Sequence, residues 1–134
     1  MTGPANMTAP ATGVVVFAHG SRVESANQAV RDVAARMSMS ASYPVEPAFL
    51  ELGQPDLAGA AERLVSRGVK RIVVIPYFLT LGTHLQRDLP RLAGDVAGRF
   101  ENVEIHITSP LDGHPGLLQA LLDRADEAVP NKAV

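Results

Sequence analysis

The segment from Arg71 to Pro76 constrains the fold more than any other part of the chain. It reads Arg-Ile-Val-Val-Ile-Pro, a short β-branched run without a polar residue in its centre. A run of this kind is typical of a strand in a parallel sheet that is buried on both faces. The chain therefore needs helices that cover two sides of a sheet.

Strand-like runs and amphipathic runs alternate along the 134 residues. We expect strands at 14–18, 45–50, 71–76 and 103–108, and helices at 25–37, 55–67, 83–99 and 116–128. Right-handed crossovers between successive strands then predict an α/β fold in three layers, a four-stranded parallel sheet with flanking helices.

Local signals refine these boundaries. Two residue pairs have the spacing of a capping box at a helix start: Ser25 with Gln28, and Thr83 with Gln86. Pro90 falls inside the third helix, which either kinks there or restarts at Asp88. Pro47 indicates an irregular second strand or an edge position for it.

Composition and charge fit one ordinary globular domain. Hydrophobic residues make up 46% of the chain and charged residues 19%, with a formal net charge of -2. That charge favours neither nucleic acid nor a membrane surface as a partner. The chain has no cysteine, which excludes disulfides, thiolate zinc sites and cysteine-ligated iron–sulfur clusters and suits the cytoplasm. Any metal must be bound by nitrogen or oxygen.

The ends of the chain differ in character from its centre. Residues 1–12 are rich in Thr, Pro, Ala and Gly and lack the features of a signal peptide, so we expect a disordered tail. Met1 and Met7 are both candidate start residues. We expect a single domain over 13–129 and a short C-terminal tail over 130–134.

Two histidines follow strands that are expected to be parallel. Ligands bind parallel sheets beyond the carboxyl ends of the strands, and His19 ends the first strand while His84 follows the third. Imidazole binds divalent transition metals and accepts protons near neutral pH. The pair therefore predicts a site that handles a divalent metal, although a histidine at a strand end can equally be a hydrogen-bonded structural residue.

Other polar residues near these strand ends leave alternatives open. Glu51 is a metal ligand or a proton acceptor, or else a solvated or capping carboxylate, which the sequence slightly favours. His114 starts the last helix or belongs to the site, and His106 lies mid-strand and is interpreted as structural. Arg22 and Arg87 are surface charges unless they meet the carboxylates of an anionic substrate.

The same residues resemble the motifs of a known family, the small class II chelatases. The opening motif is 17–22, Phe-Ala-His-Gly-Ser-Arg, and the second is 48–51, Ala-Phe-Leu-Glu, followed by Gln-Pro at 54–55. Pro-Tyr-Phe-Leu at 76–79, Gly-Thr-His at 82–84 and Asp-Leu-Pro at 88–90 resemble the third, and Pro-Leu at 110–111 with His-Pro at 114–115 the fourth. One departure is Val23-Glu24 in place of the frequent Asp-Pro, which leaves open where the first helix begins.

The resemblance implies an activity. The family inserts a divalent metal, Co²⁺, Fe²⁺ or Ni²⁺, into a tetrapyrrole of the sirohydrochlorin type without ATP or another cofactor. The short form would be half of the class II chelatase fold and would act as a homodimer, with the site between two subunits. No iron–sulfur cluster is expected, because the cysteine-bearing plant extension is absent.

The resemblance also assigns residues. His19 and His84 correspond to the metal-binding histidines and would also take part in catalysis, assisted by Glu51. Substrate-binding residues would be Ser21, Arg22, Gly82, Thr83 and Arg87. A non-catalytic metal or tetrapyrrole carrier is the alternative that the sequence cannot separate from a chelatase. Phosphoryl transfer is disfavoured because Ala18, not Arg, precedes His19, and no Gly-x-Ser-x-Gly motif supports a hydrolase.

Overall fold

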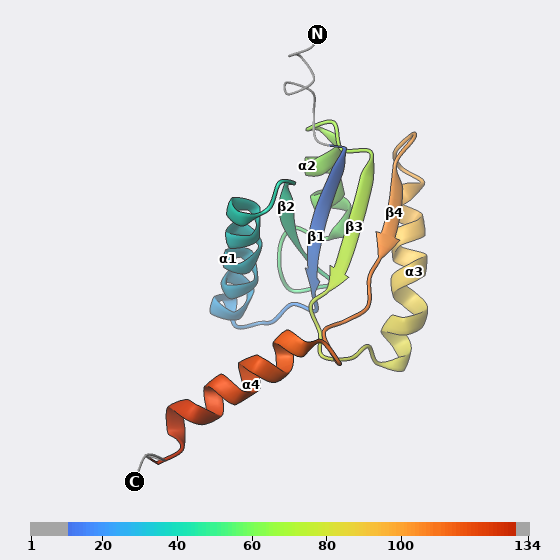
Figure 1. The fold of residues 1–134 in the computed structure, drawn as a ribbon. Helices are drawn as coiled ribbons and strands as arrows, with labels where there is room; N and C mark the ends of the chain where they lie inside the picture. Colours follow the sequence, from blue (N-terminus) through green and yellow to red (C-terminus); the bar gives the residue numbers. More distant parts are fainter. Residues whose placement is uncertain (1–10, 131–134) are drawn as a thin grey trace.

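The computed structural model describes residues 11–130, which form one sheet and its helices (Figure 1). The elements in chain order are β1 (Thr12–Ala18), α1 (Glu24–Ser40), β2 (Val45–Phe49), α2 (Leu57–Val65), β3 (Arg71–Pro76), α3 (Thr83–Ala97), β4 (Glu104–Ile107) and α4 (Pro115–Ala128). The strand order is β2-β1-β3-β4, and every pairing is parallel. The predicted four-stranded parallel α/β fold is confirmed.

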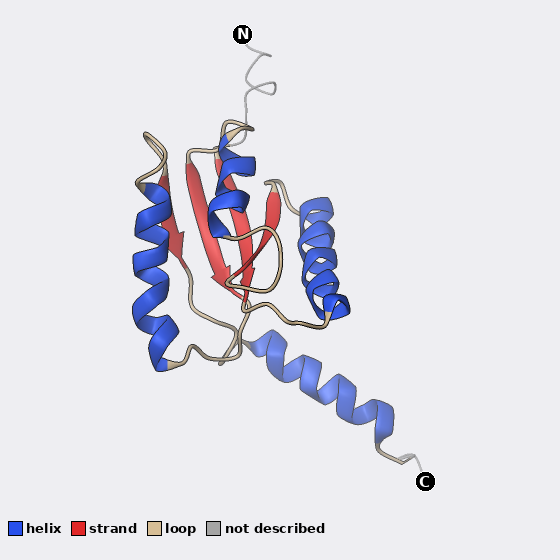
Figure 2. Cartoon of the chain, turned by 180° about the vertical axis from the view of Figure 1, so that it is seen from behind, coloured by secondary structure: helices blue, strands red, loops and turns tan. Residues whose placement is uncertain are grey.

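Helices cover the two faces of the sheet unequally. The crossover from β1 to β2 places α1 on one face, while the crossovers to β3 and β4 run the other way and place α2 and α3 on the opposite face. Figure 2, the view from behind, shows α2 in front of the strands with α3 and α1 on either side. The predicted three layers are therefore present.

Strand β1 lies at the centre of the sheet and is buried on both faces. Val15 and Phe17 pack in the larger core cluster with α2 and α3, whereas Val14 and Val16 pack with α1. Successive side chains of a strand alternate between faces, so a continuous Val-Val-Val-Phe run fills two cores at once. Burial of each such side chain stabilises the fold by about 1.5–3 kcal/mol.

The helix starts correct both capping-box predictions. Helix α1 begins at Glu24 after Val23, and α3 begins at Thr83 after Gly82, and neither start has a side-chain cap. Ser25 and Thr83 lie inside their helices rather than before them. Helix α2 does have a side-chain cap, because the Asp56 carboxylate accepts a hydrogen bond from the Gly59 backbone N–H at 2.8 Å.

Pro90 and Pro47 lie at positions that tolerate a residue without a backbone N–H. Pro90 lies inside one continuous α3, so the predicted restart at Asp88 is wrong. Pro90 is exposed while Leu89 and Ala93 face the core, so the missing backbone N–H lies on the solvent side. Pro47 belongs to β2, an edge strand, which confirms one of the two predicted alternatives.

The predicted tails need a smaller revision. Strand β1 begins at Thr12 rather than Val14, and the Ala11 carbonyl accepts hydrogen bonds from the backbone N–H groups of Lys70 and Arg71. The predicted N-terminal tail is therefore too long by these two residues. Residues 1–10 and 131–134 lie outside the described residues, so the rest of both tail predictions is not addressed by the structure.

Candidate functional site

The carboxyl ends of all four strands point to one end of the molecule, here called the rim (Figure 1). The rim consists of the loops 19–23, 50–56, 77–82 and 108–114 that follow β1, β2, β3 and β4. Backbone hydrogen bonds extend the sheet into these loops: Leu50 N–H donates to Ala18 and Tyr77 N–H donates to Phe17. The positions of residues that follow the strands are therefore set by the sheet itself.

His19 and Glu51 meet at the rim. Nε2 of His19 lies 3.8 Å from Oε2 of Glu51, and the two side chains are 55% and 56% exposed. This separation is too long for a hydrogen bond. Two atoms that bind one metal at about 2.1 Å each lie at most about 4.2 Å apart. The pair is thus close enough to bind one ion together while both groups stay open to solvent.

The approach of the first two loops depends on Gly20. The Glu51 N–H donates to the His19 carbonyl at 3.1 Å, which draws the loop after β2 against the loop after β1. A Cβ atom on Gly20 would lie 1.6 Å from the Glu51 carbonyl oxygen, and the Gly20 φ of +97° is strained for any other residue. Glycine at this position is what lets Glu51 stand beside His19.

Asn27, in α1, joins the same two loops, and no sequence pattern above predicted this role. Its side chain is 2% exposed. The Asn27 amide oxygen accepts from the Ser21 N–H at 2.9 Å, and its NH₂ group donates to the carbonyls of Ser21 and Leu52 at 2.8 and 3.0 Å. A polar residue on the buried face of an otherwise amphipathic helix is the signal that could have revealed it.

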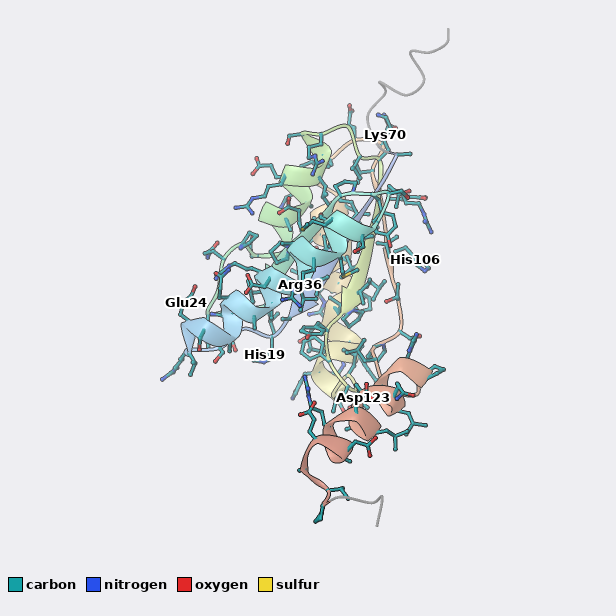
Figure 3. The ribbon with its side chains drawn as sticks, turned by 60° about the vertical axis from the view of Figure 1, so that its left-hand side comes forward. His19, Glu24, Arg36, Lys70, His106 and Asp123 are labelled. Carbon is teal, nitrogen blue, oxygen red and sulfur yellow. The ribbon has the colours of Figure 1, made fainter. Side chains whose placement is uncertain are left out.

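Glu24 completes this network at the start of α1, near the His19 end of the sheet (Figure 3). A hydrogen bond from the Arg31 guanidinium at 2.7 Å and a second from the Asn27 amide at 3.2 Å lower the pKa of Glu24. The carboxylate therefore stays charged beside the loop that carries His19.

The His84 side of the rim is built differently. His84 is the second residue of α3 and is exposed, as are Gly82, Thr83 and Arg87. No hydrogen bond or ion pair of the His84 side chain is found among residues 11–130. Both histidines thus lie at the rim on different elements, and their role as metal ligands stays a prediction.

Backbone hydrogen bonds join the loops after β3 and β4. Leu111 and Asp112 donate their N–H groups to the carbonyls of Phe78 and Leu79 at 2.9 and 2.8 Å. Phe78 anchors this side, because its ring packs against Phe17 with centroids 6.4 Å apart.

The remaining candidate residues are His114, His106, Ser21 and Arg22, and two of them, His114 and Ser21, make local hydrogen bonds. Nδ1 of His114 accepts from the Gly116 N–H at 2.8 Å, which confirms the helix-starting alternative for this residue. His106 lies mid-strand in β4 and is exposed. The Ser21 hydroxyl accepts from the Val23 N–H at 3.0 Å and so shapes the turn before α1. Arg22 is exposed beside this turn.

Candidate metal ligands are few at the rim of the described chain, residues 11–130. No group of three or more His, Asp or Glu side chains that could hold a metal ion occurs within residues 11–130. His19 and Glu51 offer one nitrogen and one oxygen, and a metal ion of this kind takes four ligands or more. Such a site suits an ion that completes its shell with water or another molecule and then leaves.

Comparison with known proteins places the chain in a family. A model of the CbiX family matches residues 13–128. The chain is 37% identical over 115 residues to the chloroplastic sirohydrochlorin ferrochelatase of Arabidopsis thaliana, covering 85% of this chain and 51% of the relative. It is 32% identical over 120 residues to the sirohydrochlorin cobaltochelatase of Sulfurisphaera tokodaii, covering 87% of this chain and 93% of the relative.

A solved structure extends the likeness to the fold. SirB from Bacillus subtilis, determined with Fe³⁺, superposes with a TM-score of 0.80 at 29% identity, covering 90% of this chain and 49% of that chain. The chain thus spans about half the length of the plant and Bacillus relatives and nearly the whole length of the archaeal one. The family match over almost all of the described sheet and helices shows that this chain belongs to the CbiX family.

Proposed function

We propose that this chain is a sirohydrochlorin chelatase, which inserts Co²⁺, Fe²⁺ or Ni²⁺ into a sirohydrochlorin-type tetrapyrrole without ATP. The observation that carries the proposal is the pair of His19 and Glu51, 3.8 Å apart and open to solvent at the rim. Relatives named as ferrochelatase and cobaltochelatase support the reaction and the two metals.

The metal ion is a substrate in this scheme. Imidazole nitrogen and carboxylate oxygen bind borderline divalent ions, so His19 and Glu51 form one half of a transient site. His84, exposed in the first turn of α3, supplies the other half. Because the chain keeps water or substrate in the remaining ligand positions, the ion can pass to the four nitrogens of the macrocycle.

Insertion also releases two protons. The metal forms bonds to all four nitrogens, and two pyrrole N–H bonds break as it does so. Neutral imidazole accepts a proton near neutral pH, and a carboxylate beside it stabilises the imidazolium that forms. His19 with Glu51 is arranged for this second task, since the carboxylate lies next to Nε2.

The peripheral carboxylates of the tetrapyrrole need cationic or N–H partners. Arg22 and Arg87 are exposed on the two sides of the rim. Each guanidinium can form a bidentate, charge-assisted pair of hydrogen bonds with a carboxylate. The start of α3 has no side-chain cap, so backbone N–H groups near Gly82 and Thr83 remain open to an anion. Ser21 contributes mainly by shaping the turn that presents Arg22.

We further propose that the working form is a homodimer and that it resides in the cytoplasm. The pairing is supported by the incomplete ligand set of one chain. The compartment is supported by the absence of cysteine from the sequence, which suits a reducing environment. No helix within residues 11–130 is long and apolar enough to cross a membrane.

The activity is tested by an anaerobic absorbance assay. Sirohydrochlorin is mixed with Co²⁺, Fe²⁺ or Ni²⁺, with and without a trace amount of protein. The proposal expects a metal-dependent spectral change faster than the uncatalysed control over many turnovers. Binding of pigment or metal without faster insertion would instead identify a carrier.

Glu51→Gln tests the assisting carboxylate. We expect insertion to slow by about tenfold, because the variant keeps the size of the side chain but removes the charge beside His19. Glu101→Gln, an exposed carboxylate in the turn before β4, is the matched control and should keep the native rate. A native rate for Glu51→Gln would remove this carboxylate from the mechanism.

A further inference from the structure

Leu52, in the loop after β2, has a backbone conformation that leucine rarely adopts. Its φ is +63°, in the left-handed region that glycine and asparagine tolerate and other residues occupy at a cost in stability. Within residues 11–130, the other non-glycine residue with a positive φ is Asn102, in the turn before β4. Asn102 is of the residue type that this conformation favours. Leu52 is the exception, and it lies next to Glu51.

Burial does not account for a leucine at this position. Leu52 is 53% exposed and belongs to neither of the core clusters found within residues 11–130. A core leucine can offset a strained backbone by removing apolar surface from water, whereas an exposed one gains little in this way. The adjacent glycine has a packing reason, because a Cβ atom on Gly53 would lie 2.9 Å from the Phe49 ring. Packing therefore explains Gly53 but not Leu52.

The surrounding loop is held so that Leu52 keeps this conformation. The buried Asn27 amide donates to the Leu52 carbonyl at 3.0 Å. Two residues further on, Nε of Arg31 donates to the Gln54 carbonyl at 3.1 Å. The same guanidinium lies over the Phe49 ring, 5.2 Å from its centroid. Because α1 fixes the loop at both points, the Leu52 side chain is kept exposed beside the metal-binding pair.

Other exposed apolar side chains lie on the loops of the rim. They are Val23 after β1, Leu50 after β2, and Tyr77 and Leu79 after β3. Exposed apolar side chains that gather in one region, with charged residues among them, are typical of a binding surface. A tetrapyrrole has apolar ring faces and an anionic edge, so it needs both kinds of partner. The arginines described above suit the edge, and the apolar side chains suit a ring face.

We propose that Leu52 contacts a face of the tetrapyrrole ring and is a determinant of its affinity. Because Leu52 is next to Glu51 in a fixed loop, this contact keeps the ring within reach of the His19–Glu51 pair. Binding of the ring covers the exposed leucine and offsets the stability lost to its backbone, as is found for strained residues at functional sites. The inference rests on the function proposed above and adds the residue that binds the apolar part of the substrate.

The first test measures affinity and stability without metal. Asparagine tolerates a positive φ, so Leu52→Asn should keep or raise the midpoint of urea denaturation. The variant should raise the Kd for metal-free sirohydrochlorin about fivefold, because the ring then covers less apolar surface. Leu52→Met keeps an unbranched apolar side chain and should restore native affinity. The Kd is read from the absorbance of the pigment during titration with protein.

The second test separates substrate contact from loop structure. In the insertion assay, Leu52→Asn should raise the KM for sirohydrochlorin by the same factor and leave kcat and the KM for Co²⁺ near native. The two metal parameters stay native because His19 and Glu51 are unchanged. A variant that lowers kcat and raises the KM for Co²⁺ as well would show that Leu52 only shapes the loop, and the inference would be wrong.

Two variants away from the rim serve as matched controls. Met39 is exposed at the opposite end of α1 from the rim, so Met39→Asn removes comparable apolar surface and should keep the native Kd for sirohydrochlorin. Asn102→Leu places a leucine at the other positive φ. It should lower the urea midpoint, because nothing offsets the strain there, and it should leave the KM for sirohydrochlorin unchanged.

Three further results would overturn the inference. They are a native Kd for sirohydrochlorin in Leu52→Asn, an equal rise in Kd for Met39→Asn, and a changed mass of Leu52→Asn by light scattering, which would assign Leu52 to a contact between copies of the chain. Since the Kd is measured without metal, the inference can fail while metal insertion stands. It can equally hold for a protein that binds the pigment without inserting metal.

Discussion

The two sides of the rim carry one histidine each but are held in different ways. On the β1 side, His19 directly precedes a turn that is fixed by Gly20 and by the four hydrogen bonds of buried Asn27. On the β3 side, His84 projects from an exposed helix start that follows Gly82, a residue with no atom within 4 Å of where a Cβ would be. The β1 side is held by buried hydrogen bonds, whereas the β3 side is exposed and has space around its glycine.

This difference suits a reaction in which the metal changes its partners. A fixed imidazole and carboxylate define the position at which the ion binds, and they lose little conformational entropy on binding it. A second imidazole, exposed in the first turn of α3, can supply a further nitrogen ligand from the other side of the rim. We therefore expect changes to the residues that fix the loop after β1 to affect both fold and activity, and changes to the exposed β3 side to leave the fold intact.

The largest expected effect is on insertion by His19→Ala and His84→Ala. Each should lower the catalysed rate at least about 100-fold, because each removes a metal ligand and a proton acceptor. Both side chains are exposed, so circular dichroism and the thermal midpoint should stay native. His106→Ala, which changes an exposed histidine away from the rim, is the control for activity. A variant at position 19 or 84 that keeps its rate would show that its side of the rim does not handle the metal.

Next in size is the contrast between two glycines. Gly20→Ala places a Cβ against the Glu51 carbonyl and forces a positive φ, so we expect the free energy of unfolding to fall by at least about 2 kcal/mol. Gly82→Ala meets nothing within 4 Å and has a φ of -70°, so it should be neutral or slightly stabilising. Urea denaturation measures both.

Equal losses for the two glycine variants would contradict the claim that only the β1 side is rigid. A second readout is available in Gly20→Ala, because displacement of Glu51 from His19 should also slow insertion.

Asn27→Asp tests the buried tie between the first two loops. The carboxylate can still accept from the Ser21 N–H but cannot donate to the carbonyls of Ser21 and Leu52. Because the group is buried, we expect a loss of about 2 kcal/mol in the free energy of unfolding. Gln28→Glu makes the same chemical change on an exposed neighbour and should lower the free energy of unfolding by only a few tenths of that amount. A native urea midpoint for Asn27→Asp would mean that the tie does not hold the loops.

The sequence predicted the sheet better than it predicted the rim. The β-branched run at 71–76 and the repeated alternation of strands and helices are local patterns, and burial on two faces enforces them. Parallel strands then bring His19 and His84 to one end without any long-range information. The exposed side chain of Glu51 was placed correctly at the end of β2, but its nearness to His19 depends on a contact between loops.

The failures share one physical cause. The Ser25 and Thr83 capping boxes have the right spacing, yet α1 starts at Glu24 and α3 at Thr83, and neither start has a side-chain cap. Asn27 caps nothing in its own helix and instead bonds Leu52, 25 residues away. A pairing of this range is decided by how loops and layers meet and not by local propensity.

The smallest expected effect concerns the charge at the start of α1. Hydrogen bonds from Arg31 and Asn27 lower the pKa of Glu24 in the folded chain, so its charged form stabilises the β1 side. For a carboxyl with a lowered pKa, this contribution is complete above the pKa of the unfolded chain and disappears as the pH falls through the folded value. Glu24→Gln should therefore be less stable than the native chain at pH 7, and the gap should close on acidification. Urea midpoints measured from pH 7 downward test this, with exposed Glu62→Gln as the control. A gap that stays constant with pH would assign the effect of the substitution to shape alone, and the charge of Glu24 would then have no part in fixing the loop that carries His19.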